Sequence, residues 1–158
     1  MATKKTIAAN LKAFIEGVED LPDAVYGPVP EIEHRPGVKP PYIVIADAGS
    51  ADDGSLDYGL DAVHSFKIAV FVADCEPRHR EKVLAGGTSI TGLYEYIDIL
   101  KKHLQHTDRN SPAPIEGVEA SLWVADEAPK KWNEKSSYLW SITSGWNIYA
   151  PHMTGQGV

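Results

Sequence analysis

The chain has 158 residues, a length that suits one folded domain built around a single hydrophobic core. Hydrophobic residues make up 43% and charged residues 23% of the sequence, a balance that excludes a disordered tail and a fibrous repeat. The 15 basic and 22 acidic residues give a formal charge of -7, which disfavours a protein that reads nucleic acid by neutralising its phosphates.

Signals for secretion or membrane insertion are weak. The single cysteine, Cys75, cannot form a disulfide within the chain, which favours reducing surroundings. Lys4 and Lys5 are followed by an amphipathic stretch rather than by the apolar run of a secretory signal peptide. No window approaches the roughly 20 apolar residues that span a bilayer. We therefore expect a protein that is made in the cytoplasm and does not enter a membrane.

The first 46 residues combine one helical pattern with an extended one. Residues 4–18 have apolar side chains at helical spacing, which predicts an amphipathic helix. Six prolines between residues 22 and 41 predict an extended connector, because proline lacks a backbone donor and biases the preceding residue away from helix. The β-branched run at residues 42–46 predicts a short strand near an edge of the sheet.

Residues 47–61 contain five aspartates, three glycines and no basic residue, a composition that favours a solvated loop. The acidic side chains of this segment are Asp47, Asp52, Asp53, Asp57 and Asp61. Their spacing departs from that of a calcium-binding loop and no glutamate closes the segment, so we expect no metal ion there.

The middle of the chain has the clearest periodicity. Residues 64–73 alternate between two faces and predict a strand. Residues 74–87 are compatible with a loop or with a single helical turn, and the sequence leaves both open. Between residues 89 and 105, apolar side chains recur every three or four positions and predict a second helix.

Two strands are expected in the last third of the chain. They cover residues 118–124 and 138–149, flank a polar hairpin excursion at residues 125–137, and include a bulge at Gly145. The element order predicts an α+β domain, with an antiparallel or mixed sheet of about four or more strands covered on one side by two helices. We expect residues 1–150 to form this single domain and residues 151–158 to form a flexible C-terminal arm.

Motifs for catalysis, phosphate binding or metal binding are weak. The glycine-rich segment 86–92 precedes a helix, but it has no lysine and fits neither common phosphate-binding pattern. Solvated side chains at a helix end are a simpler interpretation of His103, His106 and Asp108 than a metal site. Cys75 has basic neighbours but no strained turn or helix start that would activate its thiol. We expect no catalytic residue, no cofactor and no metal ion.

The last third of the chain contains four tryptophans, Trp123, Trp132, Trp140 and Trp146. Trp140 and Trp146 fit a strand in the core, whereas Trp132 lies in the charged hairpin, where its own domain offers little to bury it. Tryptophan and tyrosine are favoured where two protein surfaces meet. We therefore expect Trp132, Tyr42 and Tyr149 at an interface with another subunit or a partner.

The order of these elements and the texture of four segments resemble the tail terminator proteins of tailed bacteriophages over residues 5–150. The segments are PPYIVI at residues 40–45, FKIAVFVA at 66–73, GLYEYIDILKKHL at 92–104 and SGWNIYA at 144–150. The resemblance implies an α+β fold and a ring, usually of six subunits, that caps the head-proximal end of the tail tube. Such a ring stops growth of the tube and provides the docking surface for the neck, and the family has no catalytic motif.

This resemblance implies partners and a location. The partners would be further copies of the chain, the tail tube, a sheath protein where the tail has one, and the neck or connector protein. DNA would only pass through the lumen, and the acidic segment 47–61 would suit the lumen or rim, because like charge prevents adhesion. The protein would reside in the virion. Two alternatives remain open: another ring-forming virion component, such as a head-tail connector or baseplate protein, and a small cytosolic enzyme or ligand-binding domain.

Overall fold

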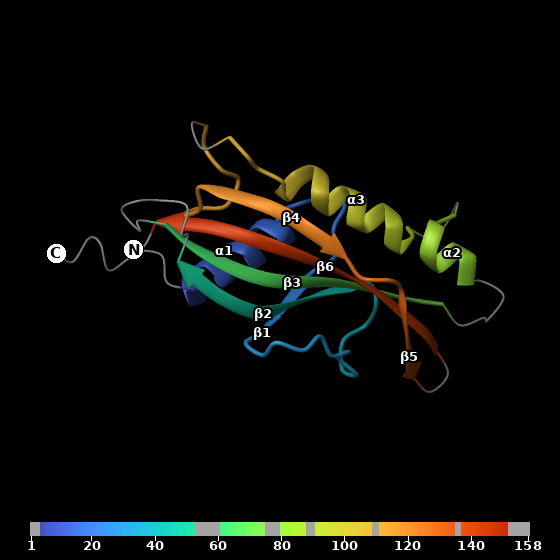
Figure 1. Ribbon diagram of the computed structural model, residues 1–158. Coiled ribbons are helices and arrows are strands. Elements are labelled where there is room, and N and C mark those ends of the chain that lie inside the picture. The colour runs from blue at the N-terminus through green and yellow to red at the C-terminus, as the bar shows by residue number, and fades with distance from the viewer. Residues whose placement is uncertain are drawn as a thin grey trace.

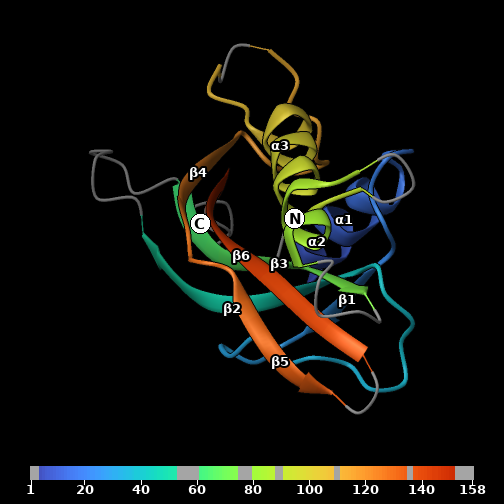
Figure 2. The ribbon, with the colours of Figure 1, turned by 90° about the vertical axis from the view of Figure 1, so that its right-hand side faces the viewer.

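A computed structural model describes residues 4–52, 61–74, 80–87, 91–108, 111–134 and 137–151 (Figure 1). Over these residues, six strands form one open, mixed sheet accompanied by three helices, so the predicted α+β class is confirmed. In chain order the elements are α1 (Lys4–Glu16), β1 (Ala24–Gly27), β2 (Tyr42–Asp52), β3 (Asp61–Asp74), α2 (Arg80–Ala85), α3 (Leu93–Leu104), β4 (Ala120–Asp126), β5 (Lys130–Glu134) and β6 (Ser137–Pro151). The helices lie together on one side of the sheet (Figure 2).

The strand order is β1-β2-β3-β6-β4, with β5 pairing separately with β6. β1 is parallel to β2, and the remaining pairs are antiparallel. Two expectations need correction here. β2 lies between β1 and β3 rather than at an edge, and the proline-rich connector contains the edge strand β1. Proline favours extended backbone, and a strand at a sheet edge tolerates prolines beside it, which explains why β1 forms there.

The main core lies between the sheet and the helices. Alternation along β3 turns Phe66, Ile68 and Val70 toward the helix side, where all three are buried. The buried face of α1 consists of Ile7, Ala8, Leu11 and Ile15. That of α3 consists of Leu93, Ile97, Leu100 and Leu104. Both helices follow the predicted periodicity, because these faces cover the sheet and remove its apolar surface from water.

A smaller cluster occupies the opposite side of the sheet, at the end where β5 lies. Its buried members are Tyr42, Val44, Ala69, Phe71 and Leu139. Trp132 of β5 and Ile32 of the connector pack against it. The open side of the sheet is therefore covered at one end by the chain's own hairpin and connector.

Strand boundaries and one bulge differ from the expectations. The segment 47–61 is not a loop throughout, since β2 continues to Asp52 and β3 begins at Asp61. A register shift between Asp47 and Ser50, with Gly49 at a φ of 108°, allows β2 to continue past its apolar part. The expected bulge at Gly145 is wrong, because β6 pairs with β3 without interruption there, and the shift lies in β4 between Trp123 and Ala125.

Strand β6 is long enough to pair with two other strands along one of its edges. Its first part pairs with β5 and its second part with β4, so the polar excursion after β4 returns as a hairpin strand. In the stretch that the sequence left open, residues 80–85 form the short helix α2.

Candidate functional site

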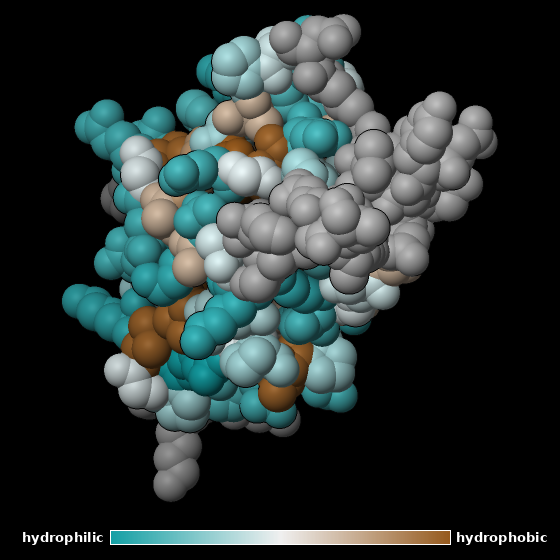
Figure 3. Space-filling view, turned by 90° about the vertical axis from the view of Figure 1, so that its left-hand side faces the viewer, coloured by the Kyte–Doolittle hydropathy of each residue, from teal (hydrophilic) through white to brown (hydrophobic). Residues whose placement is uncertain are grey.

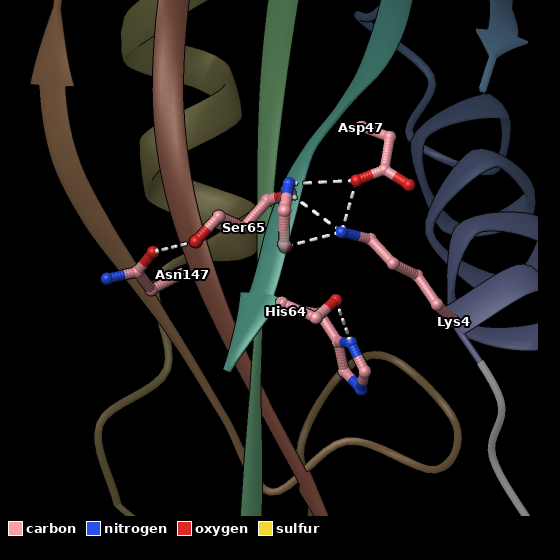
Figure 4. A network of polar contacts seen from close by, with 7 residues as sticks. Lys4, Asp47, His64, Ser65 and Asn147 are labelled. Carbon is pink, nitrogen blue, oxygen red and sulfur yellow. Dashed lines mark hydrogen bonds and ion pairs between the residues drawn. The ribbon is translucent and has the colours of Figure 1, made fainter. Parts of the chain in front are cut away.

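A polar network joins Lys4, at the start of α1, to the second half of β2 and the first part of β3. The Lys4 ammonium group makes an ion pair with the Asp47 carboxylate and donates to the carbonyl oxygens of Gly49 and Ser65 (Figure 4). It also lies 4.9 Å from the centre of the Phe66 ring. Because the register shift of β2 brings Gly49 beside Asp47, one lysine can hold the helix against both strands.

The contacts of this network favour the ionised form of the Asp47 carboxyl group. Burial alone would raise the pKa of this carboxyl group. Hydrogen bonds from Lys4 and from the Gly49 amide, the latter 2.9 Å long, act in the opposite direction. The positive charge of Lys4 and a contribution from His64 add to them, so the pKa of Asp47 lies below its ordinary value. Asp47 is therefore a paired structural charge rather than a free charge of a solvated loop.

Two further contacts hold the three neighbouring strands in register. The Ser50 hydroxyl and His64 Nδ1 lie 2.9 Å apart on directly opposed residues of β2 and β3. The Ser65 hydroxyl donates to Asn147 Oδ1 of β6 over 2.8 Å (Figure 4). Cross-strand polar pairs of this kind stabilise one register over its neighbours.

A pocket of about 570 Å³ opens beside this network, between α1 and β1. Its lining residues are Lys4, Lys5, Ala9, Lys12, Tyr26, Pro28 and Asp47. Lys12 is ion-paired to Glu16 at 2.7 Å, one helical turn further on. Burial raises the pKa of the Tyr26 hydroxyl group, and the nearby negative charge of Asp47 raises it further. An apolar floor with lysines at its rim suits an apolar or aromatic group that has acidic neighbours.

The edge strand β4 exposes large apolar side chains. Trp123 is 42% and Val124 is 54% exposed, and Tyr94 on the adjacent helix α3 is 49% exposed. Trp123 is nevertheless held firmly, because its indole N–H donates to Asp126 Oδ1 over 2.9 Å and Lys101 Nζ lies 4.2 Å from its ring centre. Lys101 also pairs with Asp126 at 2.7 Å. The β4 edge therefore presents a fixed aromatic side chain to the solvent.

Part of the β4 edge is already protected by the chain itself. His106 and Ser121 form an antiparallel bridge, and the Trp123 amide donates to Gln105 Oε1 over 2.8 Å. The protected part of β4 ends at Trp123, and the β-bulge between Trp123 and Ala125 follows it. Protecting the first half of an edge strand limits which contact another chain can make with it.

The three residues expected at an interface are placed differently by the structure. Tyr42 is only 2% exposed and stacks on Phe71 at 4.8 Å, so its ring is covered by its own chain and that expectation is wrong. Trp132 is half-buried against Phe71 and donates to the Ser141 hydroxyl over 2.9 Å, so its own domain does bury it in part. Tyr149 is half-buried in the central strand β6, between Val63 of β3 and Ala120 of β4.

The acidic residues are also separated by the structure. Asp47 is ion-paired on the helix side. Asp52 and Asp61 lie at the ends of the paired strands β2 and β3, and Asp53 and Asp57 lie outside the described residues. The two described ends of the acidic segment therefore lie in the paired strands β2 and β3, and the expected loop does not begin at Asp47.

The glycine-rich segment serves close packing between two helices. Gly86 has a φ of 89° and follows α2, while Gly92 precedes α3 and donates its amide to Glu95 Oε1 over 3.1 Å. A side chain at Gly92 would collide with the backbone at the end of α2, and one at Gly86 would collide with Glu95. Glycine is required at these two positions because the chain passes itself closely there.

The other weak motifs gain no support as sites. Within the described residues no group of three or more histidine, cysteine, aspartate or glutamate side chains could hold a metal ion. His106 joins the bridge to β4, and its Nε2 lies 3.2 Å from the Ser111 carbonyl oxygen. Cys75 lies outside the described residues. None of the described helices combines the length and the apolar character that crossing a membrane requires.

Sequence reasoning missed Lys5, Ala9, Lys12 and Tyr26 as a group. The first three follow a helical spacing along one flank of α1, a signal present in the sequence. Their relation to Tyr26 depends on β1, which the sequence did not reveal.

The sequence matches no known protein-family model. It also matches no curated protein.

Proposed function

We propose that this chain is a structural protein of a tailed-bacteriophage virion, a tail terminator whose subunits close into a ring on the head-proximal end of the tail tube. The proposal begins from the resemblance in the order of the elements and in the residue pattern of four segments. The observation that carries it is the open sheet, whose order ends at β1 and β4, with Trp123 and Val124 exposed on the β4 edge.

Open edges and exposed apolar side chains are costly in a protein that stays alone, because they invite pairing with other chains. In a closed ring, the two lateral edges of each subunit are covered by its two neighbours. On the surface at the chain-terminal end of the sheet, by contrast, the apolar side chains form separate small patches among hydrophilic ones (Figure 3). The lateral edges are therefore the better candidates for subunit contacts.

The two remaining faces of a ring would have different tasks. One binds the last ring of the tube, and the other refuses a further tube ring and accepts the neck protein. Termination needs this refusal, since specificity is a difference between the affinities for two partners. We propose that the acidic residues Asp52, Asp53, Asp57 and Asp61 lie at the lumen or rim, where negative charge keeps passing DNA from adhering. Asp47 is left out, because Lys4 neutralises it.

Native mass spectrometry of the purified chain tests the ring. A complex of about six times 17.2 kDa is expected, and a monomer at every accessible concentration would contradict the proposal.

Assembly of tail tubes in vitro tests the role of that ring. Adding the chain to polymerising tube protein of the same virus should place rings at tube ends and limit tube length in electron micrographs. A head-tail connector or baseplate protein would form rings without limiting the tube at its head-proximal end. An enzyme would give neither result.

A further inference from the structure

We propose that neighbouring subunits join when Trp123 of one copy inserts into the pocket between α1 and β1 of the next copy. This inference deepens the proposed ring and rests on it. The occupant is a second copy of this chain, and the same contact repeats from subunit to subunit.

The first argument is that both surfaces lie on the same side of the sheet. Trp123 is paired directly with Trp146, whose side chain belongs to the helix-side core, so Trp123 also projects toward the helices. On the opposite edge, Tyr26 packs against that same core, and Asp47 is paired with Phe66 of the core. When two copies meet edge to edge with their helix layers aligned, Trp123 faces the pocket.

The second argument is that strand direction permits this arrangement. β1 and β2 are parallel, and the three steps from β2 through β3 and β6 to β4 are each antiparallel. β4 therefore runs opposite to β1. Rotation about an axis along the strands keeps strand directions, so β4 of one copy meets β1 of the next in antiparallel orientation. Such a head-to-tail contact closes into a ring when the rotation divides a full turn.

The third argument is shape and chemistry. The pocket of about 570 Å³ has Ala9, Pro28 and the Tyr26 ring among its lining residues, which suits an aromatic side chain. Trp123 is pre-positioned by Asp126 and Lys101, so little conformational freedom is lost when it docks. Aromatic side chains that fill such pockets often dominate the affinity of an interface.

The fourth argument is charge. Lys5 is exposed at the pocket and makes no ion pair among the described residues. On the other edge, Glu127 is exposed just beyond Asp126 and likewise has no ionic partner in the described part of the chain. Lys5 on one edge and Glu127 on the other carry opposite charges, so a head-to-tail contact brings unlike edges together, whereas a contact between two identical edges would bring like charges together.

Substitutions on each side of the contact test it. Trp123→Ala removes the inserted side chain, and Ala9→Phe fills the pocket from within its own subunit. Both should convert the ring to a 17.2 kDa monomer in native mass spectrometry at a concentration where the wild type forms rings. Ala13→Phe is the matched control, since Ala13 is exposed on α1 outside the pocket, and it should leave the ring intact.

A crosslink tests the same geometry without removing a contact. In a Cys75→Ser background, Ala9→Cys with Val124→Cys should give a ladder of covalent oligomers with a short bis-maleimide reagent. Ala13→Cys with Val124→Cys should give much less. Rings that persist in both Trp123→Ala and Ala9→Phe, with no ladder from the Ala9 pair, would overturn this contact while leaving the ring proposal standing. A monomeric wild type would instead defeat the proposed function itself.

Discussion

The two faces of the sheet differ in how their apolar surface is covered. On the helix side, one cluster of buried side chains extends from α1 and β1 across to β6 and α3. On the open side, a smaller cluster lies under β5 and the connector, and further along the strands the Ser65–Asn147 hydrogen bond lies on the surface of the sheet. We infer that the helix-side cluster supplies most of the folding free energy, while the open-side cluster stabilises the end of the sheet where β5 lies.

Ile68→Ala should produce the largest effect, because Ile68 is fully buried in the centre of the helix-side cluster. We expect a loss of about 2–5 kcal/mol in the free energy of unfolding, from the lost burial and the cavity that remains. Urea unfolding at a fixed protein concentration measures it. Lys67→Ala, one residue away on the open side, is the control and should change stability by less than about 1 kcal/mol. Equal losses in the two variants would refute the difference between the faces.

The sequence predicted the helix side well because periodicity carries that information. Apolar spacing located α1 and α3, and alternation assigned Phe66, Ile68 and Val70 to one face. The length of β2 was missed because its second half lacks apolar alternation and is stabilised by pairing with β3. β1 was missed for a related reason, since four residues between prolines are too few to show a period.

The open side and the candidate site were predicted less well. Sequence reasoning placed Trp132 in a charged hairpin at an interface, because only the pairing of β5 with β6 brings it over Phe71. Trp123 was noted only as one of four tryptophans, and its exposure goes with the position of β4 at the end of the sheet order, which no local pattern reveals. The pocket joins α1 to β1 and β2, so it depends on contacts between distant segments that no local pattern encodes.

Trp132→Ala should have an intermediate effect on the free energy of unfolding, and it tests whether β5 stabilises the open side. The side chain is half-buried over Phe71, so its removal should cost about 1–3 kcal/mol in the free energy of unfolding. Trp132→Phe keeps an aromatic ring there but loses the hydrogen bond to Ser141, which should cost about 1 kcal/mol. Thermal or urea unfolding compares the two variants. No loss in either variant would mean that β5 does not stabilise the open side.

Asp47→Asn should have the smallest effect and reports on the polar network at the rim of the helix side. Because folding lowers the pKa of Asp47, its ionised form contributes stability at neutral pH, and that contribution is lost as the pH falls through the folded-state pKa. The asparagine keeps the shape and an oxygen for Lys4 and Gly49 but has no charge. We expect a loss of up to about 1 kcal/mol at pH 7 and none at pH values well below about 4.

Urea midpoints measured between pH 7 and pH 3 separate this charge effect from a general loss of packing. The wild type should become less stable than at neutral pH, and the difference from Asp47→Asn should shrink as the carboxyl group takes up its proton. Glu19→Gln removes one charge from an exposed position near the end of α1 and is the matched control. A difference between wild type and Asp47→Asn that stayed constant with pH would mean that the stability does not depend on ionisation of the Asp47 carboxyl group. The Lys4 ion pair would then not be what holds α1 to β2 and β3.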